Sequence, residues 1–237
     1  STTQAAVIGY RNQHTRGHIV TVEDPIEYVH RHGNCIVTQR EVGIDTMSYQ
    51  SALENAMRQA PDVIQIGEIR TPDTLKSAIV FAETGHLCLA TLHANNTYQA
   101  LERVINLYPD DTRDRLYMDL SMNLRAIISQ RLVPNAQGNG VIPAIEIMLN
   151  SPLISDLIAR GEIKDIREAI EKSFDQGMMT FDQSLFGLYE KGLITYADAM
   201  RNADSVNNLR LKIKLEGEEA KSRADFGSTY DQVEFEQ

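Results

Sequence analysis

Short β-branched runs alternate with amphipathic helical segments through the first 92 residues, and this alternation limits the possible folds more than any other feature. The runs predict strands at 18–22, 35–38, 63–66 and 87–92. Ser48 and Thr71 are typical residues for the start of a helix, and Pro61 and Gly85 are typical of a helix end. Strands separated by helices pair in parallel, so the pattern predicts an α/β fold with a mainly parallel sheet and helices on both faces.

The second half of the chain has a different pattern. An apolar stripe from Leu116 to Ile128 predicts a long helix, and two strand candidates at 131–133 and 141–147 flank a turn. From 152 to about 208 the spacing is helical. We therefore expect an α/β core at 1–149 and a helical C-terminal subdomain at 150–215. The segment 216–237 has seven acids and two bases, a composition typical of a disordered tail.

Composition excludes several classes of protein. The 237 residues have a net charge of -10, which disfavours a nucleic-acid-binding protein. The two cysteines, Cys35 and Cys88, are too few for a disulfide scaffold or a four-cysteine zinc site. No apolar run approaches the ~18 residues of a membrane span, and there is no signal peptide. These features predict a cytoplasmic protein without direct membrane insertion.

Carboxylates follow two of the predicted strands. Glu23, Asp24 and Glu27 come after the first strand, and Glu68 follows the strand at 63–66. Ligands of open α/β sheets bind at the carboxyl ends of the strands. Mg²⁺ prefers carboxylates, water and substrate phosphates, so two acidic clusters at this edge predict a metal-phosphate site. The alternative is that these acids cap the next element or face solvent.

Two histidines frame the strand at 87–92. If this strand is extended, His86 and His93 lie at opposite ends, about 23 Å apart, and cannot bind one metal ion. His93 is then at the carboxyl end, where it could donate a hydrogen bond to a phosphate. His86 is expected to pack or bond at the other end. A purely structural role for either histidine is the alternative.

The N-terminal residues resemble those that follow a phosphate-binding lysine. Ser1-Thr2-Thr3 precedes a small apolar helical segment at 4–10, but the G-x-x-x-x-G-K-[ST] pattern is absent. We therefore expect that the sequence begins inside such a motif. Because the glycines and lysine that hold phosphate are absent, the chain as given is expected to hydrolyse no ATP.

With these segments in place, the chain resembles the secretion ATPase superfamily, in particular the type IV pilus retraction ATPases of the PilT/PilU group. Residues 21–27 resemble the Asp box of that family, 39–43 its following strand and turn, and 61–70 its Walker B segment. Residues 83–93 resemble its His box, and 128–132 its Ile-Ser-Gln segment. The similarity extends from Ser1 to about Leu215. It implies a RecA-like P-loop NTPase core.

The resemblance also implies roles for individual residues. Ser1 would be the P-loop serine that binds Mg²⁺, beside Thr2 at the nucleotide. Glu68 would be the Walker B carboxylate, acting on Mg²⁺ and its water. The other implied roles are polarisation of the attacking water by Glu27, support of the site by Glu23, γ-phosphate contact by His93 and nucleotide binding by His86. ATP and Mg²⁺ are the implied cofactors.

The same resemblance implies an assembly. Retraction ATPases are homohexamers at the cytoplasmic face of the inner membrane, where they meet a pilus platform protein and drive twitching motility. In this chain 153–158 reads Leu-Ile-Ser-Asp-Leu-Ile in place of the Ala-Ile-Arg-Asn-Leu-Ile motif of the retraction group. That change favours the PilU-like branch, whose members resemble accessory motors that work with a PilT-like ATPase. The family's N-terminal PAS-like domain is not in this sequence.

Three alternatives remain from the sequence. The chain could belong to a non-catalytic coupling subunit of a retraction complex. It could be a pilus-assembly or type II secretion ATPase, although those relatives usually carry a four-cysteine zinc insertion that Cys35 and Cys88 cannot form. A DNA-translocating relative is disfavoured by the net negative charge.

Overall fold

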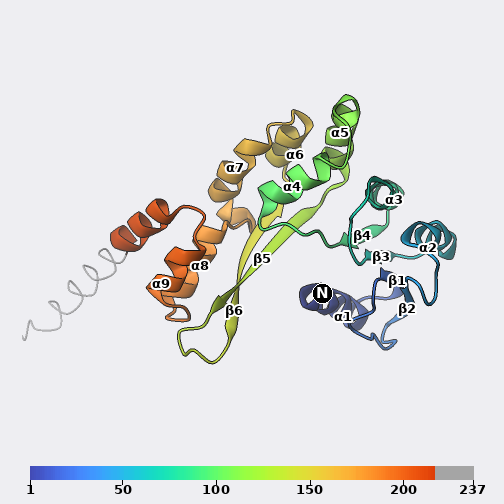
Figure 1. Ribbon diagram of the computed structural model, residues 1–237, viewed down its shortest axis with the longest axis horizontal. Helices are drawn as coiled ribbons and strands as arrows, with labels where there is room; N and C mark the ends of the chain where they lie inside the picture. Colours follow the sequence, from blue (N-terminus) through green and yellow to red (C-terminus); the bar gives the residue numbers. More distant parts are fainter. Residues whose placement is uncertain (217–237) are drawn as a thin grey trace, which may run out of the picture. The chain divides into compact units, whose positions relative to one another are not determined.

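A computed structural model describes residues 1–216, and the contacts divide these residues into two compact units (Figure 1). Unit 1 comprises Ser1–Ala94, Tyr98–Arg125 and Asn150–Ile166. Unit 2 comprises Asn95–Thr97, Ala126–Leu149 and the described residues from Arg167 onward. The chain does pass from one unit to the other at the expected boundary 149/150, but residues 126–149 belong to unit 2 and residues 150–166 to unit 1. The predicted acidic tail lies almost entirely outside the described residues.

Unit 1 is an α/β layer structure followed by helices. Its strands are β1 (Gly17–Glu23), β2 (Cys35–Glu41), β3 (Val63–Ile66) and β4 (Leu87–Ala90). Its helices are α1 (Thr2–His14), α2 (Tyr49–Ala56), α3 (Pro72–Glu83), α4 (Thr97–Ile105, whose first residue belongs to unit 2), α5 (Arg113–Asn123) and α6 (Pro152–Ala159). Short 3₁₀ turns occur at Met57–Gln59, Asp110–Thr112 and Ile163–Asp165.

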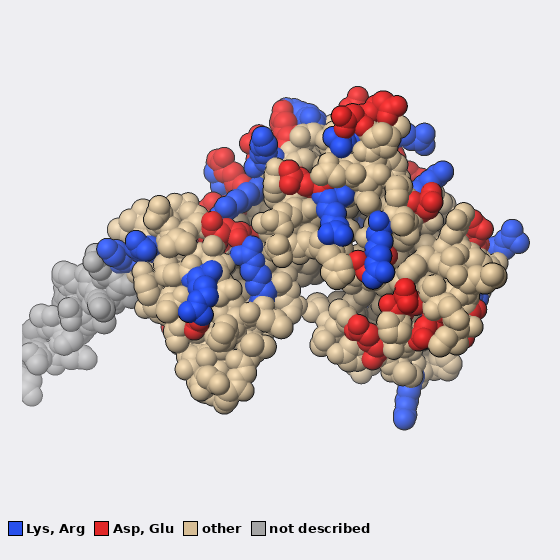
Figure 2. All heavy atoms as spheres, in the orientation of Figure 1, with Lys and Arg blue, Asp and Glu red and all other residues tan. Residues whose placement is uncertain are grey.

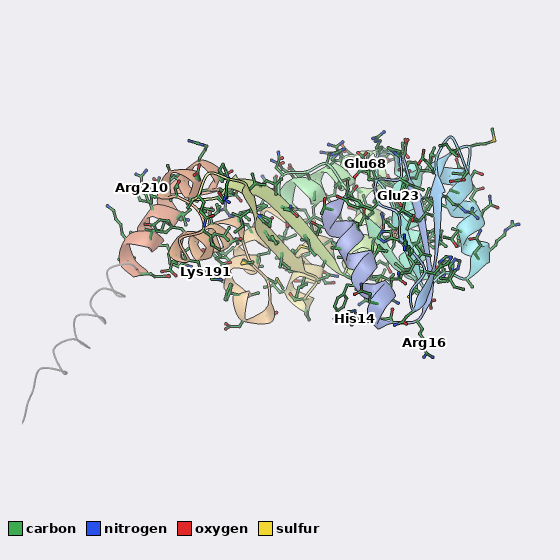
Figure 3. The ribbon with its side chains drawn as sticks, turned by 90° about the horizontal axis from the view of Figure 1, so that it is seen from below. His14, Arg16, Glu23, Glu68, Lys191 and Arg210 are labelled. Atoms are coloured by element: carbon green, nitrogen blue, oxygen red, sulfur yellow. The ribbon has the colours of Figure 1, made fainter. Side chains whose placement is uncertain are left out.

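The four strands form a parallel sheet in the order β2-β1-β3-β4, as the sequence predicted. On one face Ile8 of α1 packs against Ile19, Val37 and Val63. The neighbouring side chains of the same strands point to the opposite face, where α2 and α3 pack (Figures 1 and 3). Helices therefore cover both faces, and the strand interiors are buried accordingly.

The predicted helix boundaries are confirmed by their capping contacts. Ser48 caps α2 by accepting a hydrogen bond from the Ser51 amide, and Thr71 caps α3 in the same way. The chain reverses after α2 at Ala60, which has a positive φ of 46° immediately before Pro61. Gly85 follows α3 with a φ of 92°, a conformation that glycine adopts without steric cost.

The prediction of a long helix from Leu116 to Ile128 is wrong for the residues after Asn123. Helix α5 ends at Asn123, and Leu124 already has an extended backbone. The side chain of Asn150 donates to the carbonyl oxygens of Ser121 and Leu124, each at 2.8 Å, and so satisfies groups that a continuing helix would have bonded. Ile127 and Ile128 instead belong to the strand β5 (Ala126–Pro134), in keeping with their β-branched side chains.

Unit 2 is an antiparallel hairpin covered by helices. Strand β5 pairs with β6 (Val141–Leu149) along its whole length, so both strands are longer than the predicted segments. The helices are α7 (Ile166–Lys172, whose first residue belongs to unit 1), α8 (Phe181–Glu190), α9 (Tyr196–Asn202) and a helical stretch at 206–216, with a 3₁₀ turn at Phe174–Gln176. Phe181, Leu185 and Val133 are buried at its centre. Unit 2 thus consists mainly of helices, and it also contains the hairpin that we expected in the core.

Within residues 1–216, no helix is both long enough and apolar enough to cross a membrane.

Candidate active site

Glu23 and Glu68 lie at the carboxyl edge of the sheet. Glu23 is the last residue of β1, and Glu68 follows β3 by two residues. Figure 3 shows both near one end of the strands, whereas His14 and Arg16, which precede β1, lie at the opposite end. The parallel pairing of β1 with β3 brings these two acids together, as the sequence predicted.

The backbone on both sides of Glu68 is fixed by neighbouring strands. The Gly67 amide donates to the Val22 carbonyl of β1 at 2.8 Å. The Ile69 amide donates to the carbonyl of Thr91, just after β4, at 3.0 Å, and the Thr91 hydroxyl donates to the Gly67 carbonyl. Glu68 therefore has a defined position between β1 and β4.

The Glu68 side chain, 12% exposed, has a partner for each carboxylate oxygen. Nε2 of His93 lies 3.0 Å from Oε1, and Nε of Arg70 donates to Oε2 at 2.6 Å. Because an ionised carboxylate only accepts hydrogen bonds, Nε2 of His93 carries the proton in this contact. Arg103 of α4 donates to the His93 carbonyl at 2.9 Å and so holds the histidine main chain as well.

Glu23 is connected to the loop that follows β1. Its buried carboxylate accepts from the Thr21 hydroxyl at 2.7 Å and from Nε2 of Gln39 at 3.1 Å. The same Gln39 amide group donates to the Tyr28 carbonyl and accepts from the His30 amide. Gln39 thereby connects the end of β1 to the loop that contains Glu27.

Tyr49, the first residue of α2, approaches the same edge. A Cβ atom on Gly67 would lie 2.8 Å from the Tyr49 hydroxyl and 3.2 Å from both the Glu23 Cα and the Val22 carbonyl oxygen. A side chain at position 67 would therefore crowd the Tyr49 hydroxyl and the main chain of β1. Burial and the nearby carboxylate of Asp24 raise the pKa of Tyr49, with smaller contributions from Glu68 and Glu23, so the tyrosine stays a neutral hydroxyl beside these acids.

The other expected site residues make fewer contacts with their surroundings than Glu23 and Glu68 do. Ser1 is the exposed residue that precedes α1, with no side-chain capping bond. The hydroxyl of Thr2 lies 2.8 Å from the Tyr28 hydroxyl, which places the start of α1 beside the loop after β1. Glu27 is exposed, and no hydrogen bond or ion pair ties its carboxylate to another residue within the range 1–216.

The structure separates His86 from His93. Nδ1 of His86 lies 3.1 Å from the Phe81 carbonyl oxygen and 2.9 Å from the Thr84 hydroxyl, and its ring packs edge-on against Phe81. These contacts lie before β4, whereas His93 follows it. The arrangement matches the predicted placement of the two histidines at opposite ends of this strand.

In addition to this geometry, most of the amino-acid sequence matches a known protein family. Residues 1–181 match the family described as "Type II/IV secretion system protein". The chain belongs to this family.

Similarity within the family lies with the pilus ATPases, as the motifs predicted. The chain is 57% identical to the type IV pilus ATPase PilU of Pseudomonas aeruginosa over 92% of its own length and 57% of that protein. It is 39% identical to the type IV pilus retraction ATPase PilT of the same organism, over 88% of the chain and 60% of that protein. Of these two, PilU is the more similar.

A solved structure agrees with this relationship. The crystal structure of the pilus retraction motor PilT with bound ADP has a TM-score of 0.81 and 40% identity, covering 88% of this chain and 59% of that one. The predicted secretion-ATPase fold and the PilU-like relationship are therefore confirmed. The chain spans less than two thirds of the length of each of these relatives.

The residues at the carboxyl edge fit a Mg²⁺-nucleotide. Within the described residues 1–216, no group of three or more His, Cys, Asp or Glu side chains could hold a metal ion by itself. Mg²⁺ at a nucleotide site takes most of its ligands from phosphates and water and needs only one or two protein carboxylates. Glu68 supplies such a carboxylate, and the Ser1 hydroxyl is of the right chemistry for a further ligand.

Sequence reasoning missed four contacts at this site, made by Arg70, Tyr49, Gln39 and Arg103. Arg70 could have been found, because side chains two residues apart in an extended segment point to the same side. Tyr49 follows the helix-start residue Ser48, and nothing in the sequence indicates its contact with Gly67. The contacts of Gln39 and Arg103 depend on loop and helix placement, for which the sequence gives no signal.

Charged side chains of both signs occur on the face drawn in Figure 2, where Lys and Arg atoms are interspersed with Asp and Glu atoms. The ion pairs agree with this mixed pattern. They include Arg113 with Asp110 and Arg160 with Asp156 in unit 1, and Arg167 with Asp182 in unit 2.

Proposed function

We propose that this chain is the catalytic core of an ATP-hydrolysing motor for type IV pilus retraction, of the PilU-like accessory kind. The family membership and the similarity to PilU and PilT support the class of activity. The single observation that carries the proposal is the contact between His93 and Glu68 beside Glu23, at the edge where open α/β sheets bind their ligands.

Each site residue has a role that its surroundings allow. Glu27 is exposed and unengaged, so its carboxylate is available to orient and polarise the attacking water. Glu68 acts at the metal and its water. His93 contacts the γ-phosphate region from its position beside Glu68, and Glu23 keeps the loop after β1 in place through Gln39.

Ser1 and Thr2 lie at the start of α1, where main-chain amides favour phosphate. Mg²⁺ would neutralise phosphate charge there, held by the hydroxyl of Ser1 and by Glu68. His86 is assigned to the nucleotide site only through its place in the His box, since its bonds are to Phe81 and Thr84.

The motor is proposed to act as a homohexamer at the cytoplasmic face of the inner membrane. Its partners would be a PilT-like retraction ATPase and the pilus platform protein, with no role for nucleic acid. The chain's greater similarity to PilU than to PilT supports the accessory role.

The test is steady-state Mg²⁺-ATPase activity of the full-length protein, with native mass measured in parallel. Glu68→Gln and Glu27→Gln are each expected to lower turnover by about 10²-fold or more, because each removes a charge that acts on the metal or the water. Glu54→Gln is the matched control, since Glu54 is an exposed residue of α2 whose carboxylate accepts a hydrogen bond from the Gln50 side chain.

The outcomes separate the candidate functions. Turnover by a hexamer that both site substitutions abolish, with Glu54→Gln unchanged, supports the motor. A folded hexamer with no turnover, even beside a PilT-like partner, contradicts it and favours the coupling subunit.

A further inference from the structure

Arg70 places a positive charge at the carboxyl edge of the sheet, and the proposed mechanism does not use it. It follows Glu68 by two residues, and its Nε donates to Oε2 of that carboxylate at 2.6 Å. The Arg70 side chain is 62% exposed, whereas the Glu68 side chain is 12% exposed. A short, charge-assisted contact with a largely buried carboxylate is stronger than an ordinary ion pair between two exposed groups.

The main chain of Arg70 is fixed on both sides. The preceding residue, Ile69, is buried, and its amide donates to the Thr91 carbonyl at 3.0 Å. The following residue, Thr71, caps α3 by accepting a hydrogen bond from the Thr74 amide. Movement of the guanidinium is therefore a rotation of the exposed Arg70 side chain, which requires no rearrangement of the sheet.

Carboxylates outnumber cations around this contact. Burial raises the pKa of Tyr49 most, and Arg70 lowers it. Three carboxylates raise the same pKa further, namely Asp24, Glu68 and Glu23. The hydrogen bond to Glu68 raises the pKa of Arg70 most, and Asp24 raises it as well. Arg70 is thus a counter-charge at an acidic edge, with a second carboxylate near its guanidinium.

The carboxylate that Arg70 contacts is the one that the proposed function assigns to Mg²⁺. Both of its oxygens have partners, with Nε2 of His93 3.0 Å from Oε1 and Nε of Arg70 on Oε2. A metal ion and a guanidinium on one carboxylate repel each other, because both are positively charged. The two cations therefore compete for Glu68.

We propose that Arg70 is a positioning residue that occupies Oε2 of Glu68 as a stand-in cation and gives up this place to Mg²⁺ when the metal-nucleotide binds. This inference rests on the function proposed above, because it requires that Glu68 acts at the metal. The guanidinium keeps the carboxylate oriented and neutralised, and its exposure allows it to rotate towards Asp24. The strength of the pair between Arg70 and Glu68 then sets the Mg²⁺ concentration that the motor needs.

The test measures metal affinity directly in the full-length protein. Mn²⁺ binding at saturating ADP is followed by the electron paramagnetic resonance signal of the free ion. Arg70→Gln is expected to lower the Kd for Mn²⁺ by about threefold or more, because no guanidinium then competes for Glu68. A Kd that falls by less than this, or that rises, would overturn the inference.

Arg160→Gln is the matched control. The Arg160 side chain is 61% exposed and pairs with Asp156 of α6 at 2.7 Å, so this substitution also removes one exposed arginine from an ion pair in unit 1. Its Kd for Mn²⁺ is expected to stay within about twofold of the wild-type value. A decrease equal to that of Arg70→Gln would show a general effect of charge and would overturn the inference.

Thermal unfolding gives a second measurement. The increase in Tm on addition of Mg²⁺ and ADP is expected to be larger for Arg70→Gln than for the wild type or Arg160→Gln, because a ligand that binds more tightly stabilises the folded state more. An equal or smaller increase would contradict the exchange of Arg70 for the metal.

A double-variant cycle shows whether the effect passes through Glu68. In the Glu68→Gln background, Arg70→Gln is expected to change the Kd for Mn²⁺ by less than about twofold, because the carboxylate for which the two cations compete is gone. The full decrease in that background would mean that Arg70 acts on the metal from a distance, and it would overturn the proposed role.

The two proposals fail differently. An unchanged Kd for Mn²⁺ in Glu68→Gln alone would overturn the metal role that the proposed function gives to Glu68. Weaker binding in Glu68→Gln, together with an unchanged or higher Kd in Arg70→Gln, would overturn only the exchange of Arg70 for the metal.

Discussion

Nε2 of His93 lies 3.0 Å from Oε1 of Glu68, and the two residues follow neighbouring strands of the sheet. Arg70 occupies the other oxygen of the same carboxylate. Glu68 is therefore held from both sides, and its orientation depends on two side chains that are themselves 75% and 62% exposed. Exposed partners can be exchanged for a ligand without disturbing the core.

His93→Gln is expected to lower ATP turnover of the full-length protein by roughly 10²-fold and to leave the free energy of unfolding unchanged, because the ring is exposed. His86→Gln is the comparison and should lower turnover less than His93→Gln while reducing stability. It loses the contacts with Phe81 and costs about 1 kcal/mol of stability. Turnover and urea denaturation measured on both variants check this; equal effects on turnover would contradict it.

Gly67→Ala is expected to destabilise the full-length protein by about 1–3 kcal/mol and to reduce turnover. The new methyl group would come within 3.2 Å of main-chain atoms of β1 and within 2.8 Å of the Tyr49 hydroxyl. Gly9→Ala is the control, because a Cβ there meets nothing within 4 Å and alanine favours the helix by about 0.5–1 kcal/mol. Urea denaturation of both variants is the measurement, and a stable Gly67→Ala protein would refute the close approach.

Phe181→Ala is expected to cost about 3–5 kcal/mol, because it empties the centre of the unit 2 core and removes the surface on which Arg131 stacks. Phe174→Ala should change stability by about 0.5 kcal/mol or less, since that ring is 58% exposed. Thermal unfolding followed by circular dichroism distinguishes the two. Similar melting temperatures for both variants would show that Phe181 is not a core residue.

Cys88 is expected to resist alkylation in the folded protein. Burial raises the pKa of its thiol to about 12, so at pH 8 about one molecule in ten thousand carries the reactive thiolate. Treatment with iodoacetamide at pH 8, followed by peptide mass spectrometry, should label Cys88 only after unfolding in urea. Rapid labelling of the native protein would show that the thiol is accessible.

The sheet could be predicted from sequence because each strand contains a short apolar or β-branched run, and typical helix-start and helix-end residues mark the helices between the later strands. Parallel pairing then placed Glu23 and Glu68 at one edge without further information. The position of His93 at the same edge could be predicted in the same way, because it follows the parallel strand β4. These residues were found because strand direction alone decides on which edge they lie.

Other features depended on contacts between distant parts of the chain. Ile127 and Ile128 fit a helical stripe by spacing, but α5 ends because Asn150, 26 residues beyond Leu124, binds its last carbonyl groups. Spacing cannot reveal such a partner. The segments on either side of position 149 belong to other units than expected for a similar reason, since residues 150–166 fold with α5 and the hairpin folds with the later helices.

The interleaved division of the chain has a consequence for its synthesis. Unit 1 requires Asn150–Ile166, and unit 2 requires Asn95–Thr97, so neither is a continuous piece of polypeptide. While the ribosome adds residues in order, the first unit cannot be completed until Ile166 has emerged, by which time the hairpin of the second is already outside the exit tunnel. Unit 1 can therefore be completed once Ile166 has emerged, whereas unit 2 must wait for the residues from Arg167 onward, and a chain truncated before Asn150 would lack part of both.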